Sequence, residues 1–95
     1  MKVCLVGAGY VGLVAGVGFA LIGHEVTCVE ASPGKVEAIN RGEPPFAEPG
    51  LKEALEQCLS SGRFEATTEL GKGVRGSEVV FVCVQTPAME DGRTD

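Results

Sequence analysis

Apolar residues fall into two patterns along the chain: short continuous runs, and longer segments in which they recur every three to four positions. The continuous runs predict β-strands, at residues 3–6, 25–29 and 79–84, with a weaker one at 63–68. The periodic segments predict helices, at residues 10–22, 33–40 and 51–60, with a brief helical turn at 69–75. Strands that alternate with helices in this way are typical of a parallel sheet covered by helices.

The first predicted helix carries both branched and very small residues. We expect Val14, Val17 and Leu21 to face the sheet. Gly16 and Gly18 lower the helix propensity by roughly 1 kcal/mol each relative to alanine. Close packing of this helix on the sheet would compensate for that loss, so we expect both glycines at the contact.

Residues that favour turns and helix ends separate the predicted elements. Gly23 follows the first helix as a C-cap, and Ser32 and Pro33 begin the second helix as its N-cap and first helical residue. Three prolines and two glycines at residues 41–50 predict a loop. The sequence Ser61-Gly62 then ends the helix that follows this loop.

Right-handed connections between parallel strands restrict the order of the four strands. We predict a Rossmann-type doubly wound α/β fold, a partial one with about four strands in the order 3-2-1-4. The strand at 79–84 is apolar on both faces, which predicts a central position in the sheet. Ligands of such folds bind at the carboxyl ends of the strands where the strand order reverses, here between strands 1 and 4.

A glycine-rich turn of the form G-x-G-x-x-G joins the first strand to the first helix. Gly7 would allow a tight turn, Gly9 would let the backbone approach a pyrophosphate, and Gly12 would let the helix pack closely on the strand. The helix begins near Tyr10 and would direct its unpaired N–H groups and positive dipole end at the phosphates. The motif therefore predicts a dinucleotide site.

An acidic residue, Glu30, follows the second predicted strand. Its carboxylate can accept hydrogen bonds from the adenosine ribose hydroxyls and would repel a 2′-phosphate, which favours NAD over NADP. Similar turns occur in FAD sites, in S-adenosylmethionine sites and in other α/β proteins. The strand, the helix and the acid in the right order favour the dinucleotide among these.

Two further residues are candidates for cofactor contacts. Lys35 lies in the first turn of the second helix and could steady the ribose or the phosphates, although a lysine there is commonly just solvated. Thr86 follows the strand at 79–84, at the predicted reversal of strand order. The alternative for Thr86 is that Thr86-Pro87 only ends the strand.

Composition limits the classes of function. The 95 residues allow one small domain, and 44% hydrophobic with 22% charged residues is typical of a globular chain. The net charge of −5 argues against a nucleic-acid partner, because phosphate contacts need clustered Lys and Arg. Residues 3–23 carry no charge, but the glycines among them fit a buried strand, turn and helix. We therefore predict no membrane segment.

The four cysteines favour a reducing compartment. Cys4, Cys28 and Cys83 lie in apolar strands and Cys58 in a helical pattern, where a free cysteine behaves as a small hydrophobe. The sequence has no C-x-x-C and a single histidine, His24, so we expect neither a metal site nor a redox motif. Reduced thiols are typical of a cytoplasmic protein.

Over nearly the whole length of the chain, the sequence resembles the N-terminal part of the UDP-glucose/GDP-mannose dehydrogenases. The resemblance rests on these segments: Gly7-Ala8-Gly9-Tyr10-Val11-Gly12-Leu13, Gly23-His24-Glu25-Val26, Lys35-x-x-x-Ile39-Asn40-x-Gly42, Glu48-Pro49-Gly50-Leu51 and Val84-Gln85-Thr86-Pro87. It implies a domain that binds NAD in an enzyme that oxidises the C6 alcohol of a nucleotide-diphosphate sugar to the carboxylate. It also implies cofactor contacts by Val11, Glu30, Lys35 and Thr86.

The sequence differs from the family pattern at two positions. Glu30 replaces the usual aspartate, and Gln85 replaces the more usual glycine before Thr86-Pro87. The family's catalytic cysteine and lysine belong to a later region, together with the sugar-binding domain, and no cysteine here has the activated setting that such a nucleophile needs. We therefore assign no catalytic residue and expect an inactive, truncated NAD-binding part.

Three further expectations concern partners and alternatives. A surface left bare by an absent half of the domain would favour a homo-oligomer. A different class of function is a free-standing, non-catalytic dinucleotide-binding module. A third reading keeps the enzyme class and changes the substrate, as in hydroxyacyl-CoA or 6-phosphogluconate dehydrogenases, which share the glycine loop but are not expected to carry Glu48-Pro49-Gly50-Leu51.

Overall fold

The computed structural model describes residues 1–7 and 9–83. Strands and helices follow one another as the sequence predicts. They are β1 (Lys2–Val6), α1 (Tyr10–Leu21), β2 (Glu25–Val29), α2 (Pro33–Asn40), α3 (Leu51–Ser60), β3 (Phe64–Thr67), α4 (Leu70–Val74) and β4 (Val79–Val82). Every predicted element is present with similar bounds; the predicted end of the last strand, residue 84, lies outside the described residues.

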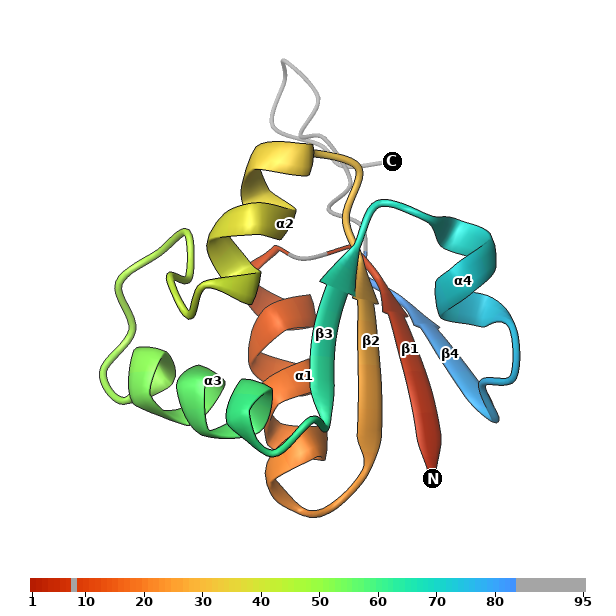
Figure 1. Cartoon of the computed structure of the whole chain (residues 1–95), viewed down its shortest axis with the longest axis horizontal. Coiled ribbons are helices and arrows are strands. Elements are labelled where there is room, and N and C mark those ends of the chain that lie inside the picture. Colours follow the sequence, from red (N-terminus) through yellow and green to blue (C-terminus); the bar gives the residue numbers. More distant parts are fainter. Residues whose placement is uncertain (8, 84–95) are drawn as a thin grey trace, which may run out of the picture.

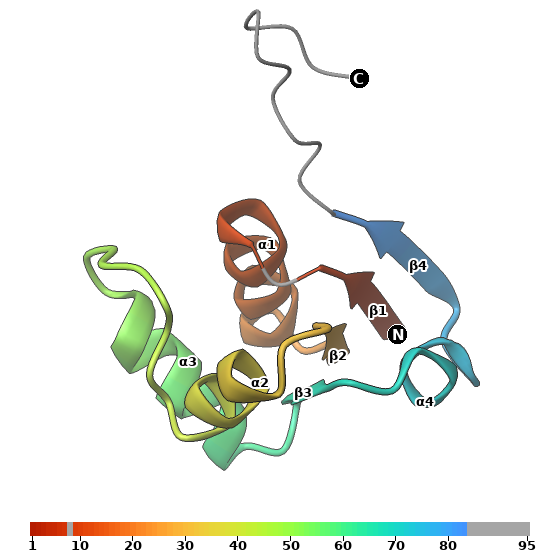
Figure 2. The same ribbon diagram turned by 90° about the horizontal axis from the view of Figure 1, so that it is seen from above.

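The four strands form one parallel sheet in the order β3-β2-β1-β4, which confirms the predicted order and the α/β fold class. Helices cover both faces of this sheet: α1, α2 and α3 lie on one side and α4 on the other (Figures 1 and 2). All carboxyl ends of the strands therefore point to the same edge. Loops that follow β1, β2 and β3 meet there, which sets the place of a ligand site.

The main core lies between the sheet and helices α1 and α3. Leu5 of β1, Leu13 of α1 and Leu55 of α3 have no exposed surface. On the opposite face, α4 lies so close to the sheet that a Cβ at Gly73 would overlap the side chain of Val29. Burial on both faces explains why β1 and β2 read as continuous apolar runs.

The prediction for the sheet-facing side of α1 is only partly right. Val17 is buried, but Val14 and Leu21 are exposed, because the buried stripe runs through other positions: Gly12, Leu13, Gly16, Val17 and Ala20. A Cβ at Gly16 would lie 3.0 Å from Phe64 Cε2, which confirms the expected close packing there. A Cβ at Gly18 would meet nothing within 4 Å, so that glycine is not at the contact.

The predicted central position of the last strand is wrong for the sheet as described. Within residues 1–7 and 9–83, β4 pairs with β1 alone and forms an edge of the sheet. Val80 and Phe81 are each 40% exposed and Val82 is 70% exposed. An apolar composition on both faces identified a strand suited to a central position, but the pairing partners decide which strand occupies one.

Turn residues act at the helix ends as expected. The Ser32 hydroxyl accepts a hydrogen bond from the Lys35 N–H at 3.4 Å, and Pro33 is the first residue of α2. Gly23, with φ of +107°, follows the last residues of α1. No helix among the described residues combines the length and the apolar character that a membrane span requires.

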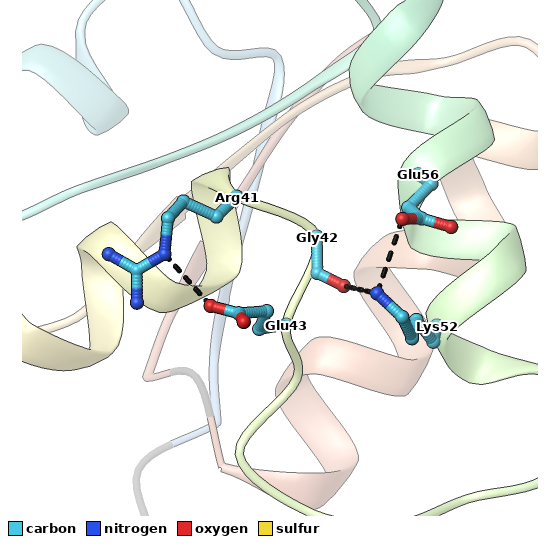
Figure 3. A network of polar contacts seen from close by, with 5 residues as sticks. All are labelled: Arg41, Gly42, Glu43, Lys52 and Glu56. Carbon is cyan, nitrogen blue, oxygen red and sulfur yellow. Dashed lines mark hydrogen bonds and ion pairs between the residues drawn. The ribbon is translucent and has the colours of Figure 1, made fainter.

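The loop between α2 and α3 is tied at both ends by polar contacts (Figure 3). Lys52 on α3 donates to the carbonyl oxygen of Gly42 at 3.4 Å and pairs with Glu56 at 3.2 Å. Arg41, after α2, pairs with Glu43 at 2.8 Å. Of these contacts, the one between Lys52 and Gly42 joins α3 to the residues that follow α2, whereas the two ion pairs are local.

Candidate dinucleotide-binding site

Two of the three motif glycines are fixed by backbone geometry. Gly7 has a φ of +107°, which side-chain-bearing residues rarely adopt, and its N–H donates to the Val29 carbonyl at 2.7 Å. A Cβ at Gly12 would overlap the Gly7 carbonyl oxygen. The turn out of β1 therefore requires glycine at Gly7, and the close approach of α1 to that turn requires it at Gly12.

Gly9 has a different environment. A Cβ on Gly9 would meet nothing within 4 Å. No packing contact in the described residues therefore explains this glycine, and the open space in front of it fits the predicted approach of a pyrophosphate. The role of Gly9 in cofactor binding stays a prediction.

The N-terminal turn of α1 directs backbone N–H groups at the same space. Within residues 1–7 and 9–83, the first hydrogen bond of this helix runs from the Leu13 N–H to the Gly9 carbonyl at 2.9 Å, and the N–H groups of Tyr10, Val11 and Gly12 precede it without a partner in that part of the chain. The N-cap, Gly9, has no side chain to accept from them, and this first turn contains no acidic residue. The positive end of the helix dipole and these N–H donors suit an anion.

Glu30 lies beside the glycine loop, at the end of the neighbouring strand. A pocket of about 300 Å³ joins the two at the carboxyl edge of the sheet; it is lined by Val6, Gly7, Val29, Glu30, Ala31, Thr68 and Leu70. The Glu30 carboxylate accepts a hydrogen bond from the Ser32 N–H at 2.9 Å, which orients it before any ligand arrives. An apolar pocket with a carboxylate at its edge suits an adenosine.

Sequence reasoning missed two residues of this pocket, Thr68 and Leu70. Both follow β3, and the Glu30 N–H donates to the Thr67 carbonyl at 2.9 Å, so the two chain segments leave the sheet together. The predicted strand order contained the signal, because it placed the end of strand 3 next to the end of strand 2.

The other predicted contacts are distributed around this edge. Val11 is 68% exposed on the first turn of α1, and Lys35 is exposed on the first turn of α2. Thr86 lies outside the described residues, as does Gln85. The structure thus brings Gly7 of the glycine loop and Glu30 together at one pocket, and it leaves the roles of Lys35 and Thr86 as predictions.

Tyr10, the first residue of α1, makes contacts that sequence reasoning missed. Its ring lies 5.2 Å from the ring of Phe46, centroid to centroid, at an interplanar angle of 50°. A hydrogen bond to the Glu48 carboxylate, together with its charge, raises the pKa of the Tyr10 phenol. A pocket of about 600 Å³ lies along this part of the loop, which includes Pro44 and Pro49.

The cysteines pack as small apolar residues, as the sequence predicts. Cys4, Cys28 and Cys58 are buried, and Cys83 is partly buried. Burial, with a smaller contribution from the Glu30 charge, raises the pKa of Cys28 to about 12, so its thiol stays protonated at neutral pH. This thiol donates to the Gly7 carbonyl at 3.7 Å. Cys28 therefore supports the glycine loop rather than acting as a nucleophile.

Three features together define a dinucleotide-binding domain of the Rossmann type: a parallel sheet, a turn after β1 whose positive φ requires glycine, and a carboxylate directly after the adjoining strand. The chain belongs to the UDP-glucose/GDP-mannose dehydrogenase family, because the model of that family's NAD binding domain matches residues 1–95. Family membership selects NAD among the cofactors that glycine-rich turns bind, and it confirms the resemblance found in the sequence.

Individual relatives agree with this assignment. The chain is 46% identical over its whole length to UDP-glucose 6-dehydrogenase of Rhizobium meliloti and covers 22% of that protein. A solved GDP-mannose dehydrogenase from Pseudomonas aeruginosa matches the whole chain with a TM-score of 0.94 and 41% identity, over 22% of its own length. A UDP-glucose dehydrogenase from Pyrobaculum islandicum matches 98% of the chain with a TM-score of 0.90 and 42% identity, again over 22% of its length.

The chain thus spans about a fifth of the length of the relatives it matches. These relatives are named UDP-glucose 6-dehydrogenase and GDP-mannose 6-dehydrogenase, and the model that matches this chain is that of the family's NAD binding domain.

Proposed function

We propose that this chain is the N-terminal NAD-binding part of a longer dehydrogenase that oxidises the C6 alcohol of a nucleotide-diphosphate sugar to the carboxylate. The observation that carries the proposal is the single pocket shared by the glycine loop and the Glu30 carboxylate at the carboxyl edge of the sheet. Relatives named UDP-glucose 6-dehydrogenase and GDP-mannose 6-dehydrogenase support the substrate class. The chain's four free thiols support a cytoplasmic location.

Each part of the site would hold a different part of the cofactor. The N–H groups of Tyr10 and Val11 would bind the pyrophosphate across the space in front of Gly9. Glu30 would accept hydrogen bonds from the adenosine ribose, and Lys35 would lie at the same end. When bound, NAD supplies the hydride acceptor for the oxidation. The chain's own residues bind and orient it, and we assign no proton transfer to them.

Calorimetric titration of the chain with NAD, and with NADP in parallel, tests the cofactor site. We expect NAD to bind more tightly than NADP, because the Glu30 carboxylate repels a 2′-phosphate. Gly9→Val should abolish binding by filling the pyrophosphate position, while the fold is kept because that position is open. Gly18→Val adds the same side chain at another open position of α1 and should leave binding unchanged. Unaltered NAD binding by Gly9→Val would overturn the loop assignment.

Two substitutions of Glu30 separate the effect of its charge from the effect of its hydrogen bond with the Ser32 N–H. Glu30→Ala removes both the charge and the acceptor for the Ser32 N–H, whereas Glu30→Gln keeps an acceptor and removes only the charge. Both should narrow the preference for NAD over NADP, by about tenfold if the ribose contact is worth about 1.4 kcal/mol. A preference ratio that stays constant in both variants would show that Glu30 is not the ribose partner.

The domain assignment has its own test. An antibody raised against this chain should detect, in an extract of the source cells, a protein several times its length, since the matched relatives are that much longer. The purified long protein should reduce NAD when given UDP-glucose or GDP-mannose. A native protein of 95 residues would instead favour the free-standing, non-catalytic module.

A further inference from the structure

The geometry points to Phe46 as a positioning residue for the cofactor: its ring holds the Tyr10 side chain against the loop at residues 44–50, and so fixes the first turn of α1 where the pyrophosphate would bind. Glu48 supports the same contact through its effect on the Tyr10 phenol. This inference rests on the proposed function. Neither residue touches the cofactor in it; both act through Tyr10.

The loop at residues 44–50 is a firm support for such contacts. Phe46 packs against the hydrophobic core, and Leu51 and Leu55 of α3 are buried just beyond the loop. The Leu51 N–H donates to the Glu48 carbonyl at 3.0 Å, and Gly50, with φ of +81°, makes the turn into α3. The backbone of the loop is therefore fixed on both sides of Glu48.

Tyr10 needs a support because of its position. It is the first residue of α1, about half of its surface is exposed, and its backbone N–H is one of the three donors of that turn that have no partner among residues 1–7 and 9–83. In both views the loop between α2 and α3 lies on the same side of the sheet as α1 (Figures 1 and 2). A phenol that left Phe46 would be free to rotate over the donors that bind phosphate, so holding it to the loop keeps the space before Gly9 open.

The negative charge of Glu48 also indicates that this residue acts by positioning Tyr10. A carboxylate near a pyrophosphate would by itself weaken the binding of an anionic cofactor. Glu48 therefore contributes to the site through the Tyr10 hydroxyl that it binds, not through attraction. The two effects oppose each other: loss of the repulsive charge would by itself tighten NAD binding, so weaker NAD binding by Glu48→Gln reports the loss of the support that Glu48 gives to Tyr10.

The chain offers a direct optical probe of this contact. Tyr10 is its single tyrosine and it has no tryptophan, so the phenolate absorbance reports this residue alone. In Glu48→Gln the pKa of the Tyr10 phenol should fall toward its ordinary value, because the acceptor charge is gone. Glu53→Gln removes an equal charge from the nearby first turn of α3 and should leave that pKa unchanged.

Calorimetry with NAD then tests the function of the contact. We expect Glu48→Gln and Phe46→Ala to weaken NAD binding by about three- to tenfold, as loss of one aromatic or charged hydrogen-bond contact would. Phe46→Tyr retains a ring and should bind as the unmodified chain does. Tyr10→Phe combined with Glu48→Gln should bind no more weakly than Tyr10→Phe alone, because both changes break the same link. Thermal unfolding of each variant separates these losses from a loss of fold.

Each outcome bears on the inference. A lowered Tyr10 pKa with unchanged or tighter NAD binding in Glu48→Gln would show a merely structural contact and overturn it. An unchanged pKa would show that the contact does not form in solution, with the same consequence. If the unmodified chain binds no NAD, this inference fails together with the cofactor site proposed for the chain alone, and the domain assignment, which the length of the native protein tests, is unaffected. NAD binding that is unaffected by all these substitutions overturns the inference alone.

Discussion

Strands β2 and β4 are both short and apolar, yet their surroundings differ. In β2, Val26 is 3% exposed and Cys28 not at all, because the strand pairs with β1 and β3 and has helices over both faces. In β4, Val82 is 70% exposed, because within the described residues β1 is its single neighbour. Apolar composition thus indicates what a strand is suited to, and the neighbouring elements decide how much of it is buried.

The same difference divides the molecule into a closed side and an open side. The closed side consists of β1, β2 and β3 with α1, α3 and α4, and it contains the buried core and the Glu30 pocket. The open side is β4, whose main contact beyond β1 is the stacking of Phe81 on Phe19 of α1 at 5.5 Å between centroids. We expect stability to reside in the closed side, and four substitution experiments test this from the largest effect to the smallest.

Gly12→Ala should have the largest effect. The new Cβ would overlap the Gly7 carbonyl oxygen, a backbone atom that cannot move without opening the turn at the centre of the closed side. We expect a loss of about 3 kcal/mol in the free energy of unfolding, at the upper end for overpacking, and loss of NAD binding. Urea denaturation measures the first effect and calorimetry the second. A variant as stable as the unmodified chain would show that this helix does not approach the turn so closely.

A matched pair of valines measures the contrast between the two sides. Val26→Ala on β2 removes two buried methyl groups and should cost about 2 kcal/mol, whereas Val82→Ala on β4 should cost less than about 0.5 kcal/mol. Both substitutions are compared by urea denaturation at one pH. Equal losses would mean that β4 is covered in solution, by a second copy of the chain for instance, which sedimentation would detect.

Alkaline pH should weaken the closed side through Cys28. Burial raises the pKa of this thiol from an ordinary value of 9.0 to about 12, so the folded chain keeps a proton that the unfolded chain loses. The stabilisation is fully present below pH 9 and is lost as the pH rises toward 12. Its contribution to the free energy of unfolding should fall by about 1.4 kcal/mol per pH unit in that window.

The control is Cys28→Ala, in which that contribution is absent. The stability difference between the unmodified chain and this variant should shrink as the pH rises through the window, because the remaining ionisable groups are common to both. A difference that stays constant with pH would show that the Cys28 thiol ionises equally in the folded and unfolded chains.

Gly16 and Gly18 of α1 give the smallest contrast. Gly18 faces open space, so Gly18→Ala should stabilise the chain by about 1 kcal/mol through helix propensity. At Gly16 the new Cβ would lie 3.0 Å from Phe64 and 3.3 Å from Leu5, which should cancel that gain. Thermal melts of the two variants provide the comparison. If Gly16→Ala and Gly18→Ala raise the melting temperature equally, the side chains of Phe64 and Leu5 move away from the new methyl group at little cost.

The sequence allowed the fold to be predicted because most of its signals are local. Periodicity located the helices, Ser32 and Pro33 marked a helix start, and the right-handed connection rule ordered the strands. The sheet-facing side of α1 was harder to predict. With valines and leucines almost all round the helix, hydrophobicity could not distinguish the sides, and the buried stripe was set instead by glycines small enough to touch the sheet.

For the candidate site, the sequence provided the glycine loop and Glu30 but not their supports. Thr68 and Leu70 enter the pocket only because β3 lies beside β2, and Phe46 and Glu48 reach Tyr10 only because of the path of the loop after α2. Such contacts join residues distant along the chain, and no local pattern encodes them. For β4 the two predictions disagreed: the strand order placed it at the end of the row, as observed, whereas its apolar composition predicted a central position.

The register of the sheet also affects the order in which the chain can form it during synthesis. β1 leaves the ribosome first, but the Glu78 N–H that bonds to the Lys2 carbonyl at 2.8 Å emerges 76 residues later. Until then β1 has one unpaired edge, and in a parallel sheet no hairpin can cover it early. The nascent chain therefore exposes an apolar strand edge until β4 has been made, and a chaperone that covers such edges would protect it over that interval.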